Sequence, residues 1–134
     1  MKKIINIILK IVLSLVLLLP VMGVLRIFPE ATADLYNTPQ AFAFIQMLAG
    51  SAAYIDYIIA IVFVLSLILI WTNRMALAAI LILPIVVNII GFHLFLDGGL
   101  FTPGAIPAII ILALNFYFLW QQRANYIPLL NKTN

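Results

Sequence analysis

The stretch LAAILILPIVVNIIGFHLFL, residues 77–96, decides the class of fold because it has no acidic residue, lysine or arginine. An apolar run of roughly 20 residues is what a helix needs to cross a hydrocarbon core of about 30 Å. Three further apolar runs cover residues 4–25, 54–71 and 105–120. The alternating pattern of membrane β-strands is missing, and backbone groups in lipid must be paired within each segment. The sequence therefore predicts an all-α integral membrane four-helix bundle.

Composition supports one membrane domain over residues 1–134. Of the 134 residues 66% are hydrophobic and 8% charged, and the mean hydropathy is +1.26, far from the balance of a soluble domain. Four spans leave no room for a separate soluble catalytic domain. The chain has no cysteine, which excludes thiolate nucleophiles and cysteine-bound clusters for the chain acting alone.

Basic residues predict the orientation in the membrane. On one side of the expected spans lie Lys2, Lys3, Lys10, Arg74, Arg123 and Lys132, whereas Arg26 falls on the other. Under the positive-inside rule, both termini are expected to be cytoplasmic, in the cell membrane, which would be the inner membrane of a bacterium. The same residues are scattered at span ends rather than gathered on one face, so nucleic acid is not an expected partner.

The segment between the first two spans, residues 28–53, is expected to form short interfacial helices on the outer side. Pro29 and Thr38-Pro39 are typical helix starts and Gly50 a typical stop. Such a helix would lie across the outer mouth of the bundle or rest on lipid headgroups. The connection at residues 97–104 is predicted to be a compact turn by its glycines and proline.

Five of the polar residues inside or at the outer ends of the spans are candidates for a functional role. Asn88 and Asn115 are expected near the bilayer midplane, with His93, Asp56 and Arg26 toward the outer ends. An ionisable group facing lipid costs about 2.5–3.5 kcal/mol at a helix centre, so such residues usually turn inward. We therefore expect an outward-opening pocket lined by Asn88, His93, Asp56 and Asn115.

His93 admits three interpretations. It could be a packing residue that donates one hydrogen bond to Asp56, to Asp97 four residues on, or to a carbonyl. It could instead bind a ligand or handle a proton, because imidazole has an ordinary pKa of about 6.5. A metal site is not expected, since one histidine without cysteines gives too few ligands for a closed zinc site.

The other polar residues also have structural interpretations. The amides of Asn88 and Asn115 could bridge neighbouring helices, as amides commonly do in membranes. Arg26 and Asp56 could form an ion pair that closes the outer ends of the first two spans, or could clamp an anionic substrate.

Much of the chain resembles the DoxX-like family of small four-helix membrane proteins. The resemblance is carried by VNIIGFHLFLD at residues 87–97, by residues 99–130 and by FIQMLAGSAAYIDY at residues 44–57. It implies association with membrane redox systems, since namesake proteins are linked to thiosulfate:quinone oxidoreductase. Many members carry a glutamate in the middle of the second span, whereas here the residues around Val62 are apolar and the acid of that span is Asp56.

Two functions follow as hypotheses. In the first, the pocket binds a small lipophilic molecule such as a quinone, as part of a membrane redox system. In the second, the protein is a non-enzymatic accessory or assembly protein, whose outer segment contacts a membrane or redox partner. Catalysis by the isolated chain is not expected. A transporter is disfavoured because four spans with little charge leave no polar path through the cytoplasmic half. A homo-oligomer could supply such a path between its subunits.

Overall fold

The structure, a computed structural model, describes residues 1–131, and within that range it contains helices and connecting turns but no strand. The elements in chain order are α1 (Lys2–Val24), η1 (Ala33–Leu35), α2 (Pro39–Ala49), α3 (Ala53–Trp71), α4 (Met75–Phe95), η2 (Pro103–Ala105), α5 (Ile106–Gln121), η3 (Arg123–Asn125) and η4 (Ile127–Leu130). The all-α prediction is confirmed over the described residues. Lys132, one of the predicted orientation signals, lies outside them.

Four helices are long and apolar enough to cross a membrane: α1, α3, α4, and α5 together with η2. Each begins and ends within two residues of its predicted bounds. Their outer surfaces are apolar, with Leu15 60%, Ile61 58% and Phe116 55% exposed. Surfaces of this kind are stable only when lipid or another protein covers them, so the protein is a membrane protein.

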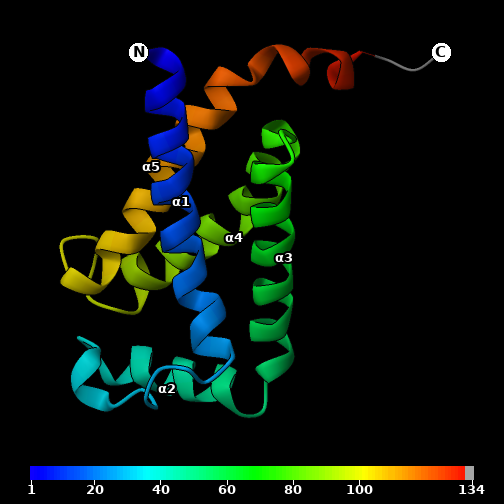
Figure 1. Cartoon of the computed structure of the whole chain (residues 1–134). Helices are drawn as coiled ribbons and strands as arrows, with labels where there is room; N and C mark the ends of the chain where they lie inside the picture. The colour runs from blue at the N-terminus through cyan, green and yellow to red at the C-terminus, as the bar shows by residue number, and fades with distance from the viewer. Residues whose placement is uncertain (132–134) are drawn as a thin grey trace.

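The bundle core lies where α1 and α4 each pack against both α3 and α5 (Figure 1). Its largest fully buried apolar side chains include Leu13, Leu17, Phe63, Ile82 and Phe118. Proline stands inside two of these helices, at Pro20 in α1 and at Pro84 in α4, and both helices continue past it.

Helix α2 lies across one end of the bundle (Figure 1). Thr38 caps its N-terminus by accepting a hydrogen bond from the Ala41 N–H at 3.1 Å, and Pro39 fills the first helical position, where a missing N–H costs nothing. Gly50 follows its last residue, so the predicted start and stop are confirmed. The expected helix start at Pro29 is wrong, since no helix begins between the end of α1 at Val24 and Ala33.

The two ends of the bundle differ in what they contain. We call the end with the first turns of α1, the α3–α4 turn and the last turn of α5 the terminal end. The opposite end, with α2, the start of α3 and the α4–α5 connection, is the α2 end (Figure 1). The Tyr117 hydroxyl donates to Asn6 Oδ1 at 2.9 Å, which joins α1 and α5 at the terminal end.

Candidate functional site

The most organised polar group lies at the α2 end, where α4 finishes. His93 Nδ1 and Asp97 Oδ2 are 3.0 Å apart, and the two residues are 8% and 2% exposed. Because a carboxylate only accepts, Nδ1 carries the hydrogen and donates it. The sequence allowed this pairing at a spacing of four, and the structure selects it from the partners considered for His93.

The second oxygen of Asp97 holds a distant segment of the chain. Oδ1 accepts from the backbone N–H of Asn37 at 2.9 Å and from the Asn37 side-chain amide at 3.3 Å. The neighbouring Thr38 hydroxyl donates to the carbonyl of Leu96. The entry to α2 is therefore fixed to the end of α4 by both side chain and backbone.

The glycine at position 98 allows this close approach. Gly98 has φ +82°, and a Cβ built there would lie 3.2 Å from the Asn37 Cβ, so a larger residue is strained for two reasons. A Cβ on Gly104 would lie 3.6 Å from both Asp97 Oδ2 and His93 Cε1. The backbone of η2 therefore covers the histidine–aspartate pair on another side.

Aromatic rings surround the same place. Phe92 contacts the His93 ring edge to face with centroids 5.0 Å apart, and Phe44 and Tyr36 lie 5.6 Å and 6.4 Å from Phe92. Tyr36 also lies 6.0 Å from Phe42. We call Tyr36, Phe42, Phe44 and Phe92 the aromatic cluster.

A cleft of about 320 Å³ opens beside the aromatic cluster and is lined by Ala33, Tyr36, Asn37, Thr38, Pro39 and Phe42. Burial raises the pKa of the Tyr36 hydroxyl, and the negative charges of Asp97 and Asp56 raise it further. Tyr36 therefore keeps its proton and can donate a hydrogen bond at neutral pH. Asn37 is shared, since it lines the cleft and also binds Asp97.

Asn88 is not part of this arrangement. Its side chain is exposed on the outside of α4, with Nδ2 donating to the Pro84 carbonyl at 2.9 Å. The expectation that Asn88 faces an inward pocket with His93 is wrong. The physical reason is rotation: five residues turn an ideal helix by about 140°, and the proline in α4 does not bring the two side chains together.

Asn115 lies in the core, as expected, but bridges nothing. It is 0% exposed, and neither amide atom has a hydrogen-bond partner among residues 1–131. It stands nine residues into α5, about 14 Å along the helix from the α2 end. His93 and Asn115 therefore do not line one pocket.

The expected ion pair between Arg26 and Asp56 is absent from the described part of the chain. Arg26 is exposed in the turn after α1, at φ 54°, where its N–H bonds to the Gly23 carbonyl. Asp56 is partly buried in the first turn of α3. The chain has left α1 before Arg26, so the packing of α1 against α3 does not bring this side chain to Asp56.

Sequence reasoning missed Tyr36 and Asn37 as parts of the site. Asn37 and Asp97 are 60 residues apart and share no pattern along the chain. The one local signal was the helix start at Thr38-Pro39, which places Asn37 directly before a cap. No family model, curated protein or solved structure matches the chain.

Proposed function

We propose that the protein binds a small carbonyl-bearing lipophile, such as a quinone, in the cleft at the α2 end. The observation that carries the proposal is an aromatic-lined cleft directly beside a buried histidine–aspartate pair. At about 320 Å³ the cleft is at the lower end of the range for small-molecule sites, which suits one ring.

Each side of the cleft has a distinct role. Tyr36 and Phe42 give flat apolar contact, and the Tyr36 hydroxyl donates to a carbonyl oxygen of the ring. The charge of Asp56 helps to keep that hydroxyl protonated. His93 takes part through Asp97, which orients Asn37 at the wall of the cleft.

The imidazole is joined to the cleft wall through one carboxylate, since Asp97 Oδ2 bonds to His93 Nδ1 and Oδ1 accepts from Asn37. The resemblance to the DoxX-like family is in keeping with a quinone and with a membrane redox system, although the family's mid-span glutamate has no counterpart near Val62.

The test is direct binding of a short-chain benzoquinone to the full chain in mild detergent, alongside mass spectrometry of lipophiles retained through purification. Tyr36→Phe removes one hydroxyl and should weaken binding roughly fivefold, the value of about 1 kcal/mol for one hydrogen bond. Tyr54→Phe is the matched control, because Tyr54 is 64% exposed on α3 and does not line the cleft. Equal affinity in wild type, Tyr36→Phe and His93→Phe would refute the proposal.

We further propose that both termini are cytoplasmic, in the cell membrane. Lys2, Lys3, Arg74 and Arg123 belong to the terminal end, whereas the segment between α1 and α2 carries Glu30 and Asp34 at the other. A reporter that is active only in the cytoplasm should be active when it is fused after Asn134. Activity of a periplasmic reporter at the same position would contradict this orientation.

A second candidate function, an accessory or assembly protein, is favoured by the position of Asn88. This amide is exposed well inside the α4 span, on a face shared with Ile80, Pro84 and Val87. Its Oδ1 has no hydrogen-bond partner among the described residues. An unpaired amide oxygen in hydrocarbon is costly, and a helix of another polypeptide or of a second copy would satisfy it.

The absence of cysteine makes this candidate simple to test. Val87→Cys, 53% exposed on the same face as Asn88, should form cross-links in native membranes treated with a thiol–amine cross-linker, whereas Val64→Cys, 41% exposed on α3, should not. Adding Asn88→Leu to Val87→Cys should abolish these cross-links. Equal cross-linking at both positions, or none at Val87→Cys, would exclude an interface on this face of α4.

A further inference from the structure

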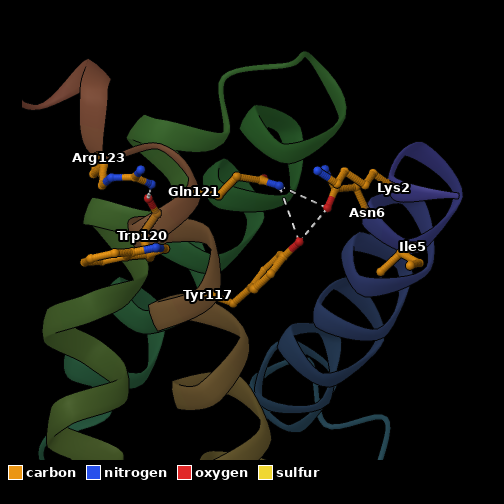
Figure 2. A pocket seen from close by; sticks show the side chains of 7 residues that line it. All are labelled: Lys2, Ile5, Asn6, Tyr117, Trp120, Gln121 and Arg123. Carbon is orange, nitrogen blue, oxygen red and sulfur yellow. Dashed lines mark hydrogen bonds between the residues drawn. The ribbon is translucent and has the colours of Figure 1, made fainter.

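A second cleft, of about 420 Å³, lies at the terminal end between the first turns of α1 and the last turn of α5. Figure 2 shows the side chains around it, with Lys2 and Asn6 on α1 facing Tyr117 and Gln121 on α5. The quinone site proposed above is at the opposite end of the bundle, so the two are independent.

A hydrogen-bonded platform organises this cleft. Asn6 Oδ1 accepts from the Tyr117 hydroxyl at 2.9 Å and from Gln121 Nε2 at 3.1 Å, and Gln121 Nε2 lies 3.4 Å from the Tyr117 oxygen (Figure 2). These bonds use the side-chain oxygen of Asn6. The two hydrogens on Asn6 Nδ2 have no partner among the described residues, so they remain available as donors at the cleft.

The charges around the cleft are all positive. Lys2 and Arg123 line it, and no acidic side chain does. The Arg123 guanidinium lies 4.8 Å above the Trp120 ring and donates to the Trp120 carbonyl at 3.0 Å, which holds it in place (Figure 2). Neither cation has an ion-pair partner in residues 1–131.

The wider charge distribution favours an anion here. The four acidic residues of the chain are Glu30, Asp34, Asp56 and Asp97, and all belong to segments at the α2 end. The terminal end holds basic residues and, in the described chain, no acid to neutralise them. The first backbone N–H groups of α1, which have no partner within the helix, add to this positive end.

The surroundings of the cleft point to a lipid. Trp120 is 71%, Phe116 55% and Ile5 49% exposed, so apolar surface continues from the cleft along the spans. Tryptophan and tyrosine are enriched at membrane–water interfaces, and basic pockets between spans bind anionic headgroups. We infer that this cleft binds the phosphate of an anionic phospholipid, with Lys2 and Arg123 as its cationic contacts and the acyl chains along α1 and α5.

The experiment uses the full chain in lipid nanodiscs of phosphatidylcholine with a rising fraction of phosphatidylglycerol, and native mass spectrometry to count retained lipids. Wild type should retain phosphatidylglycerol in preference to phosphatidylcholine. Lys2→Gln with Arg123→Gln should lose that preference by roughly thirtyfold, because each basic residue near an anionic lipid is worth about a factor of five.

A matched control separates a site from general attraction. Lys3→Gln with Arg74→Gln removes the same charge from the same end, but neither residue lines the cleft. An equal loss in this control would overturn the proposal, as would retained preference in the Lys2–Arg123 variant. Millimolar inorganic phosphate should not displace the lipid. If inorganic phosphate displaced the lipid and raised the melting temperature of the protein as much as phosphatidylglycerol does, the cleft would be a site for a free anion and the lipid proposal would be overturned.

Discussion

Removing the Asp97 carboxylate should release the entry of α2 from the end of α4. Asp97 is 2% exposed and accepts three hydrogen bonds, two from Asn37 and one from His93. Asp97→Ala leaves the buried His93 donor without a partner, whereas the two donors of the exposed Asn37 can turn to water. Losing a charge-assisted network with one buried donor costs about 3 kcal/mol of unfolding free energy.

The conservative variant should behave differently. In Asp97→Asn the amide oxygen can still accept from Asn37, and the His93 ring can accept from the new amide after its hydrogen moves to Nε2. We therefore expect Asp97→Asn to cost about 1–2 kcal/mol, well below Asp97→Ala.

Hydrogen exchange at one amide gives a local measurement. The Asn37 N–H bonds to Asp97 Oδ1 at 2.9 Å, so Asp97→Ala should speed its exchange by about thirtyfold, equivalent to about 2 kcal/mol for one bond to a charged acceptor. Asp34→Ala is the control, since Asp34 is exposed in the same segment and bonds to neither residue. Unchanged exchange at Asn37 in Asp97→Ala would refute the assignment of Asp97 as the anchor of α2.

Three further outcomes are expected from the same structure. Asn115→Leu should raise the unfolding free energy by about 1–3 kcal/mol, because it removes a buried amide without partners, and a fall in thermal stability would reveal a polar partner for that amide. Gly98→Ala should cost about 1–2 kcal/mol for its positive φ and its contact with Asn37, whereas Gly91→Ala, with open space around its Cβ, should be neutral or stabilising; equal melting temperatures would contradict the tight turn. Burial, and secondarily the charges of Asp97 and Asp56, raise the pKa of Tyr36 above its ordinary value of 10.0, so the stability that the protonated hydroxyl contributes is complete below that pH and is lost as the pH rises further. In thermal melts from pH 8 to 11.5, Tyr36→Phe should therefore lose less stability at alkaline pH than wild type. An identical alkaline loss in the variant would contradict this assignment to Tyr36.

The membrane spans could be predicted from the sequence because lipid imposes a length on every apolar helix. The bounds of α1, α3, α4 and α5 follow from where apolar residues stop. Helix α2 could be placed by Thr38 and Gly50, which act locally through the cap and the stop.

The direction of each side chain within a span could not be predicted in the same way. In α4 nearly every position is apolar, so no polar face marks which side meets the core, and Asn88 was wrongly placed inside. Rotating α4 to turn Asn88 inward would expose buried residues such as Ile82 and Val86, and the cost of that exposure exceeds the cost of leaving one amide facing lipid. The contact of Asn37 with Asp97 depends on how α2 lies across the bundle, which no local pattern encodes.

The anchoring of α2 also sets an order of assembly during synthesis. Asn37 leaves the ribosome 60 residues before Asp97. At about 5–20 residues per second, α2 waits roughly 3–12 s for its partner. During that interval Asn37 and Thr38 have neither Asp97 nor the Leu96 carbonyl to bind, although α2 can already pack against α3. The entry to α2 is therefore fixed to the bundle only after the end of α4 has been synthesised, so Asp97 must be in place before this end can close.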